Sequence, residues 1–216
     1  MALPEDLDRA YAEALAAGRP EAARLRALLD FRRALFRRDL EEARRLLPPD
    51  EEELARFLSD LEAGRLEPWL EAGPAFVRAE AWVRRGAELA EGGEKAAARE
   101  AFERALALFP RHPRALVNLG NLELEAGRTD AAIAYYQKAL EIDPELADAH
   151  HNLAVAYKRK GDLDRMVRHL KRAQRLRLYP PRESLGRRGG VPPFYARFWF
   201  WFLLAALAYL LLRGRG

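Results

Sequence analysis

An internal repeat with a period of 34 residues is the feature that most constrains the fold of this chain. Three segments of this length, 79–112, 113–146 and 147–180, follow one another without an insertion. Small residues recur at the eighth, fifteenth, twentieth and twenty-seventh places, with one exception at the twentieth, and a large apolar residue recurs at the twenty-fourth. In order of place, these residues are Gly86, Gly120 and Ala154; Gly93, Gly127 and Gly161; Ala98, Ala132 and Met166; Phe102, Tyr136 and Leu170; and Ala105, Ala139 and Ala173. A segment of this size cannot bury its apolar face alone, so the pattern predicts stacked helical hairpins.

The positions of glycine and proline in each segment predict two helices joined by a tight turn. Glycine at the fifteenth place suits the turn that ends the first helix, and Pro110 and Pro144 at the thirty-second place end the second helix. The third segment has Leu178 at that place. The whole pattern over 79–180 resembles the tetratricopeptide repeat (TPR), a helix–turn–helix unit of 34 residues. The resemblance implies an all-α fold, a TPR-type α-solenoid.

The segments on either side of the repeats are predicted to be a helical extension before them and a linker after them. Residues 1–78 have helical composition and periodicity, and we expect them to cap the first open face of the solenoid. Within them, 24–47 has the form of a degenerate hairpin of the same general kind, but it is out of phase with the three repeats. Residues 181–193 are rich in proline, glycine and arginine and are predicted to be a linker.

The segment 194–212 is almost continuously apolar and predicts a transmembrane helix, with 213–216 as a short basic tail. The apolar run is long enough to cross a bilayer core of roughly 30 Å. A buried core helix is the alternative interpretation, but such a helix usually carries polar residues on one face. The side chains expected to anchor the chain in lipid are Phe198, Trp199, Trp201, Leu203, Leu204, Leu207 and Leu210.

Positive charge is concentrated next to the predicted span. Residues 147–216 carry 15 basic and 4 acidic side chains, a net charge of +11, while the whole chain has +4. The positive-inside rule then predicts a single-pass protein with its N-terminal body in the cytoplasm, for which a bacterial inner membrane is the simplest setting. Basic side chains expected to contact anionic lipid are Lys171, Arg172, Arg175, Arg177, Arg187, Arg188 and Arg197. Nucleic acid is the other common partner of basic patches, but no nucleic-acid-binding motif accompanies this one.

The TPR resemblance also implies a concave groove lined by the first helix of each unit. The groove residues that it implies are Val83, Ala87, Arg114, Val117, Asn118, Asn121, Leu124, His151, Asn152, Val155 and Lys158. We expect Asn118 and Asn152 to pair their amides with the backbone of an extended peptide, while a merely solvated face is the alternative. Some TPR co-chaperones clamp a C-terminal carboxylate at five positions, of which only Asn118 matches here. Asp148 at another of these positions would repel a carboxylate.

Nothing in the sequence nominates a catalytic, metal or cofactor site. The chain has no cysteine, and its four histidines lack the spacing of a metal motif. No glycine-rich phosphate loop occurs, and the acidic residues are scattered over helix surfaces. We therefore predict a protein that is not an enzyme and needs no cofactor: a membrane-anchored TPR adaptor or scaffold that binds protein partners during assembly or biogenesis of a membrane-associated complex. The alternative is a structural accessory subunit of a larger membrane complex, with the span packed against other transmembrane helices.

Overall fold

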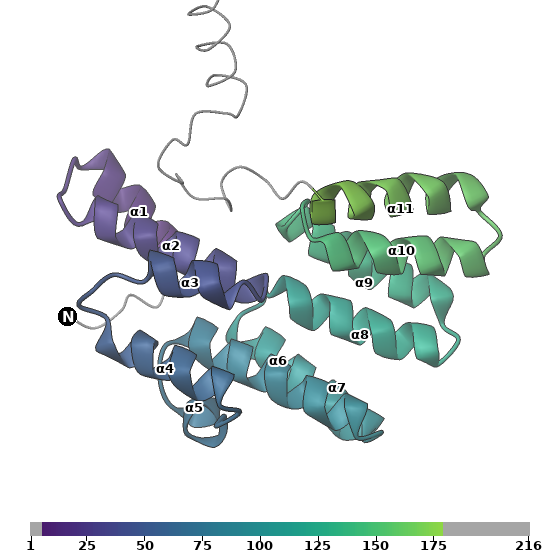
Figure 1. The fold of residues 1–216 in the computed structure, drawn as a ribbon, viewed down its shortest axis with the longest axis horizontal. Helices are drawn as coiled ribbons and strands as arrows, with labels where there is room; N and C mark the ends of the chain where they lie inside the picture. Colours follow the sequence, from purple (N-terminus) through teal and green to yellow (C-terminus); the bar gives the residue numbers. More distant parts are fainter. Residues whose placement is uncertain (1–5, 179–216) are drawn as a thin grey trace, which may run out of the picture. The chain divides into compact units, whose positions relative to one another are not determined.

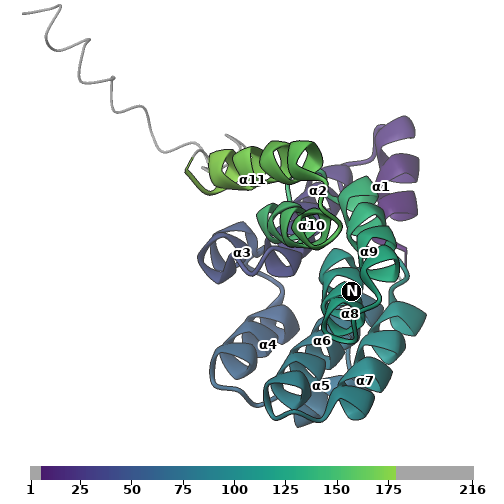
Figure 2. The ribbon, with the colours of Figure 1, turned by 90° about the vertical axis from the view of Figure 1, so that its right-hand side faces the viewer.

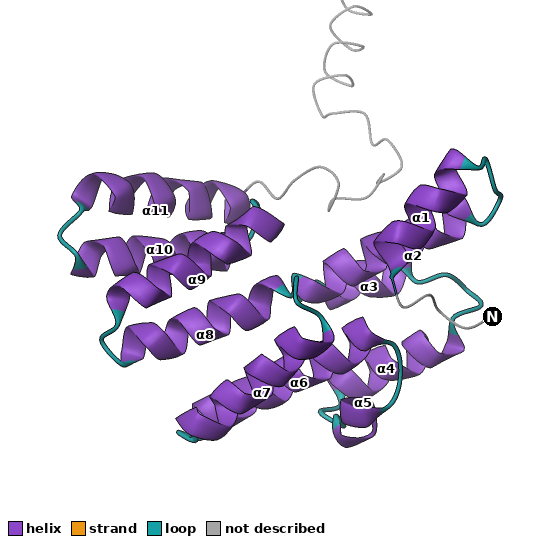
Figure 3. Cartoon of the chain, turned by 180° about the vertical axis from the view of Figure 1, so that it is seen from behind, coloured by secondary structure: helices purple, strands orange, loops and turns teal. Residues whose placement is uncertain are grey.

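The computed structural model describes residues 6–178 of the chain. This part consists of eleven α-helices, and it contains no strand (Figures 1 and 3). The helices are α1 (Leu7–Ala16), α2 (Ala22–Phe36), α3 (Leu40–Leu46), α4 (Glu52–Glu62), α5 (Glu67–Glu71), α6 (Ala75–Glu91), α7 (Lys95–Leu108), α8 (Pro113–Glu125), α9 (Thr129–Ile142), α10 (Ala147–Arg159) and α11 (Leu163–Leu178).

The last six helices form three antiparallel hairpins, α6 with α7, α8 with α9, and α10 with α11 (Figures 1 and 2). The turn inside each hairpin contains one glycine with a positive φ, at Gly93 (85°), Gly127 (79°) and Gly161 (77°). An L side chain is unfavourable in this left-handed region, which explains the glycine at the fifteenth place of each repeat. The first hairpin begins at Ala75, four residues before the 34-residue register.

Close approach of the two helices explains the glycine at the eighth place. A Cβ atom added to Gly86 would lie 2.5 Å from the ring of Phe102, and one added to Gly120 would lie 2.5 Å from the ring of Tyr136. Both rings are almost completely buried. The aromatic residue at the twenty-fourth place therefore fills the space that a side chain at the eighth place would need.

The helices α2 and α3 form a fourth hairpin with the same local construction. Arg38 lies in its turn with a φ of 61°, the one positive φ of a residue other than glycine within residues 6–178. Ala43 follows five residues later and is fully buried, as Ala132 is five residues after Gly127. This hairpin overlaps the segment 24–47, and arginine stands in the place of the turn glycine.

The N-terminal helices pack on the repeats through α2 and α5. The ring of Phe36 lies 5.3 Å from that of Phe109 and 4.0 Å from that of His112. At the other contact, α5 packs on α6, and Trp82 Nε1 donates a hydrogen bond to the carbonyl oxygen of Leu70 (3.1 Å). These helices therefore contact the connection after α7 as well as the first hairpin, which is more than the cap over one open face that the sequence predicts.

None of the helices within residues 6–178 is both long and apolar enough to cross a membrane. The predicted span 194–212, with all seven of its anchoring residues, lies outside the described residues. So do the linker 181–193 and three of the expected lipid contacts, Arg187, Arg188 and Arg197. These features stay predictions from the sequence.

Candidate partner-binding groove

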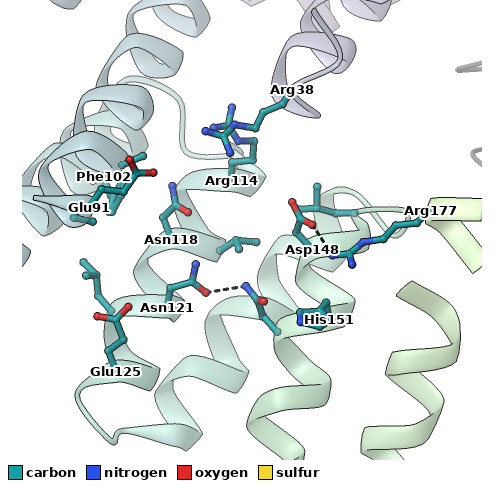
Figure 4. Close-up of a pocket in the computed structure, with 16 residues that line it drawn as sticks. Arg38, Glu91, Phe102, Arg114, Asn118, Asn121, Glu125, Asp148, His151 and Arg177 are labelled. Carbon is teal, nitrogen blue, oxygen red and sulfur yellow. Dashed lines mark hydrogen bonds and ion pairs between the residues drawn. The ribbon is translucent and has the colours of Figure 1, made fainter. Parts of the chain in front are cut away.

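A cavity of about 350 Å³ lies over α8, with walls contributed by α6, α10 and the turn before α3 (Figure 4). We call it the groove. Seven of the eleven residues predicted for the concave face line it: Ala87, Arg114, Val117, Asn118, Asn121, His151 and Asn152. The other residues of its lining are Arg38, Ala90, Glu91, Phe102, Leu122, Glu125, Leu146, Asp148 and Arg177.

Four predicted residues lie elsewhere, and two of these predictions are wrong for a physical reason. Val83 is fully buried in the apolar cluster that contains Phe102, so it offers no pocket to a partner. Leu124 is only 8% exposed and belongs to the apolar cluster around Tyr136. Val155 is half-buried against that same cluster, and Lys158 is exposed outside the groove. The repeat spacing predicted that Val83 and Leu124 lie on the open face, but their side chains fill the space between helices.

A hydrogen-bonded pair of asparagines forms part of the groove floor. Asn121 Oδ1 accepts two hydrogen bonds, one from the hydroxyl of Tyr136 and one from Nδ2 of Asn152, each 2.8 Å long. Burial raises the pKa of Tyr136 above its usual value, so the hydroxyl keeps the proton that it donates. Asn118 is half-buried in the groove, and its side chain has no hydrogen-bond partner within residues 6–178. The free carboxamide is therefore that of Asn118, while Asn152 is partly engaged by the protein itself.

A buried ionic network holds Arg114 at one end of the groove. Glu80 is 1% exposed, and its carboxylate accepts hydrogen bonds from Arg114 Nη1 (2.6 Å) and from His112 Nε2 (3.2 Å). His112 is fully buried and accepts a bond from the backbone N–H of Ala115 at Nδ1 (3.4 Å), which leaves its proton on Nε2. Burial lowers the pKa of His112, so this imidazole is neutral. Burial alone would raise the pKa of Glu80, but Arg114 and His112 stabilise the carboxylate and the pKa lies below its usual value.

Two ion pairs lie at other parts of the groove wall. Arg177 Nη2 is 3.2 Å from Asp148 Oδ1, and Lys95 Nζ is 2.9 Å from Glu125 Oε2. The sequence assigned Arg177 to anionic lipid, but its side chain pairs with Asp148 and lines the groove. The remaining expected lipid contacts of α11 stay off the groove: Lys171 and Arg175 are exposed and Arg172 is half-buried.

Arg38 lines the groove, although the sequence did not predict it there. Its turn lies outside the three repeats, and arginine is an unusual residue at a positive φ. A usable signal was present, since the interval from Arg38 to Ala43 equals that from the turn glycine to the small residue in two of the three repeats. The charge of Arg114 and burial both lower the pKa of Arg38, which shows that the two cations share one end of the groove.

No group of three or more potential metal ligands occurs within residues 6–178. Two histidines do face each other between α10 and α11, with 3.0 Å between the Nδ1 atoms of His150 and His169. His150 Nε2 donates to the carbonyl oxygen of Pro144 (3.1 Å), so Nδ1 of His150 accepts the proton of His169. This arrangement is a hydrogen-bonded pair of neutral imidazoles.

Family models of the tetratricopeptide repeat match three overlapping stretches of the chain, 89–134, 120–161 and 149–180. The chain therefore contains tetratricopeptide repeats, and its described part is an all-helical solenoid of the TPR type.

Similar proteins include a plant enzyme and several solved structures of MamA. The probable UDP-N-acetylglucosamine–peptide N-acetylglucosaminyltransferase SEC of Arabidopsis thaliana is 36% identical over 85 residues, which is 38% of this chain and 8% of that enzyme. The chain thus spans less than a tenth of the length of this relative. A crystal structure of MamA is 27% identical over 71% of this chain and 92% of its own, with a TM-score of 0.45. MamA from Desulfovibrio magneticus RS-1 is 23% identical over 81% of this chain and 96% of its own, with a TM-score of 0.44.

Proposed function

We propose that this protein is an adaptor that holds an extended segment of a protein partner in the groove. The observation that carries this proposal is the unpaired carboxamide of Asn118, which lies in the cavity beside the hydrogen-bonded pair of Asn121 and Asn152. A carboxamide offers both a donor and an acceptor, which is what one residue of an extended peptide backbone requires. His151 lines the same cavity, and its imidazole also has no hydrogen-bond partner within residues 6–178.

The position of the cavity suits a short peptide segment. The cavity opens along α8 between two neighbouring hairpins, and its volume of about 350 Å³ accommodates a few side chains. The polar side chains of its lining come from positions that recur in successive repeats, such as Asn118 and Asn152. A partner with a regular spacing of backbone groups, such as an extended peptide, fits positions that recur in this way.

In this proposal the segment 194–212 anchors the adaptor in a membrane as a single span, with the repeats on the cytoplasmic side. The support comes from the sequence: the apolar run and the basic stretch before it. The helix α11 adds support of its own, since Leu163 (61%), Val167 (39%) and Leu178 (73%) are exposed apolar side chains. Exposed cations on the same helix, such as Lys171, give α11 a composition that suits an anionic lipid surface.

A selection from a library of random 12-residue peptides tests the groove. The double variant Asn118→Ala/His151→Ala serves as the counter-selection, because neither side chain has a hydrogen bond within the described residues and the fold should persist. Gln174→Ala is the matched control, since it removes an exposed carboxamide from α11, away from the groove. We expect peptides that bind the intact protein and the control but bind the double variant at least ten-fold more weakly. If no peptide were enriched, or if every enriched peptide bound the double variant equally well, the groove would not be the partner site.

Extraction of the full chain from membranes tests the anchor. We expect the full chain to resist alkaline carbonate and to dissolve only in detergent, while a variant without 194–212 is released. Release of the full chain by carbonate would contradict the span. Extraction in mild detergent separates the two uses of a span: a mostly free protein supports the adaptor, and recovery in a complex of fixed stoichiometry with other membrane proteins supports the accessory subunit.

A further inference from the structure

One end of the groove carries more positive charge than its own residues neutralise. Arg38 and Arg114 extend into this end from two different hairpins, and their guanidinium groups lie together above Asn118 in Figure 4. The carboxylate of Glu80 binds Arg114, but it also accepts the hydrogen bond of His112. The guanidinium group of Arg38 has neither a hydrogen bond nor an ion pair within residues 6–178.

The nearby carboxylates compensate Arg38 only in part. Asp148 and Glu80 attract Arg38, but Asp148 is paired with Arg177 and Glu80 with Arg114. Arg84 on α6 adds a further cation to the surroundings of Arg38, and its side chain has no partner in the described part of the chain. Repulsion by Arg114 has the largest effect on Arg38, and a further anion bound between the two guanidinium groups would relieve it.

The backbone of Arg38 supports a role in binding. In the other three repeat-type hairpins the corresponding turn residue is a glycine, and glycine has no steric penalty at this φ. An L residue in the left-handed region is sterically disfavoured, so arginine at this turn is a stability disadvantage. Unfavourable backbone conformations of this kind concentrate at functional sites, where the side chain that they position is needed.

We propose that Arg38 and Arg114 form a subsite for a carboxylate of the bound peptide, with Asn118 holding the adjacent backbone. The proposal rests on the proposed function of the groove and names the chemistry of its partner. Arginine presents planar donors that suit a carboxylate, and two arginines can hold one carboxylate from two sides. Arg38 lies outside the three repeats, so the subsite differs from the co-chaperone clamp that the sequence does not match.

The test uses the peptides selected on the groove, measured by fluorescence anisotropy against the full chain in detergent. Arg38→Gly is the informative variant, because it removes the guanidinium and relieves the backbone at once. We expect it to weaken the selected peptides at least ten-fold, the scale of one charge-assisted hydrogen bond, while the melting temperature stays unchanged or rises. Arg168→Gln, which removes an exposed cation from α11, is the control and should leave the affinity unchanged.

Changes in the peptide identify the source of the carboxylate. Replacing each Asp or Glu by its amide tests a side-chain carboxylate, and amidation of the C-terminus tests a terminal one. We expect one of these changes to weaken binding to the intact protein and to have little further effect on Arg38→Gly, since both remove the same contact. Selected peptides that bind Arg38→Gly as tightly as the intact protein, or that tolerate every loss of a carboxylate, would overturn the subsite while leaving the groove in place. Failure to select any groove-dependent peptide would overturn the proposed function itself.

Discussion

At the scale of single residues, the shape of the groove depends on a carboxylate that never reaches the groove surface. Glu80 is buried on α6 and holds Arg114 on one side and His112 on the other. His112 in turn precedes α8 and accepts a hydrogen bond from its first turn. One buried anion therefore connects the first hairpin to the start of the second and orients an arginine of the binding surface.

We expect Glu80→Ala to lower the free energy of unfolding by about 3 kcal/mol, because it leaves Arg114 without its counter-ion and His112 without its acceptor. Equilibrium unfolding in urea measures the change. Glu88→Ala on the same helix is the control: its pair with Arg85 is exposed, so its loss should change stability by less than about 0.5 kcal/mol. Equal effects of the two substitutions would show that the buried network contributes no more to the free energy of unfolding than an exposed ion pair does.

At the scale of helices, the two helices of a hairpin pack closely because a small residue at the eighth place leaves room for a large one at the twenty-fourth. Gly120 leaves room for the ring of Tyr136, and Gly86 leaves room for the ring of Phe102. The third hairpin has the smaller Leu170 at the twenty-fourth place and tolerates Ala154 at the eighth. The size of one residue therefore sets the size of its partner on the facing helix.

Gly120→Ala should destabilise the protein by about 1–3 kcal/mol, since the new methyl group overlaps the Tyr136 ring. A double-mutant cycle with Tyr136→Leu provides the internal control. In the Tyr136→Leu background, where the ring is gone, we expect the same Gly120→Ala change to be neutral or stabilising. If the effects of Gly120→Ala and Tyr136→Leu on thermal unfolding were additive, overlap with the Tyr136 ring would not explain the glycine at position 120.

The pairing of α10 with α11 should depend on pH through His150 and His169. Burial lowers the pKa of both imidazoles, and the neighbouring charges of Arg172 and Arg168 act in the same direction. A lowered pKa means that the unfolded chain binds protons more readily than the folded one. Stability is therefore complete above about pH 6.5, the ordinary histidine pKa, and falls as the pH drops below it.

Hydrogen exchange of α11 between pH 8 and pH 5, corrected for the intrinsic exchange rate, measures this dependence. Opening of α11 should become easier at low pH, because two protonated imidazoles would bring donors face to face at the 3.0 Å contact. His169→Phe keeps an aromatic ring beside Tyr157 and should reduce the pH dependence. The buried His112 adds a dependence of the same sign to global stability, so the comparison is made on α11 alone. An unchanged pH dependence in His169→Phe would exclude the pair as its source.

At the scale of the whole described part, one arginine connects the N-terminal helices to the connection between the second and third repeats. Arg37 at the end of α2 donates to both carboxylate oxygens of Asp143 (2.7 Å each) and to Glu145 (3.3 Å). The hydrogen bond to Asp143 raises the pKa of Arg37 more than burial lowers it, and the charges of Asp143 and Glu145 add to the rise. Because Arg38 is the next residue, this contact also fixes the turn that carries Arg38 to the groove.

Arg37→Ala should lower the free energy of unfolding by about 1–3 kcal/mol, since it removes both guanidinium donors of the largely buried Asp143 and leaves it only the backbone N–H of Glu145. It should also weaken the selected peptides, although Arg37 does not line the groove, because the turn before α3 loses its attachment. Arg44→Ala, which breaks an exposed pair with Glu62, is the control and should change neither quantity much. Peptide affinity that survives Arg37→Ala would show that Arg38 is positioned by other contacts.

The sequence predicts the repeats well because their signals are local. Gly93, Gly127 and Gly161 mark turns whose positive φ only glycine adopts without penalty, and the places of the small residues follow from the helix period. The groove is predicted only in part, since the same spacing cannot tell an open face from a closed one: Val83 is buried while Ala87, one turn later, lines the cavity. The spacing from Arg38 to Ala43 marks a turn, but it does not place that turn at the groove, because its position depends on the contact of Arg37 with Asp143, more than a hundred residues away in the sequence.

Photo-crosslinking of a selected peptide to the full chain tests the central claim about the groove most directly. A benzophenone side chain placed at position 91 lies at the exposed edge of the groove without replacing a residue that the proposal assigns to binding, and one placed at position 138 lies on the exposed face of α9. We expect the peptide to crosslink from position 91 and not from position 138, and Arg38→Gly to reduce the yield at 91. Crosslinking from position 138 with none from position 91 would place the partner elsewhere and contradict the groove as the binding site.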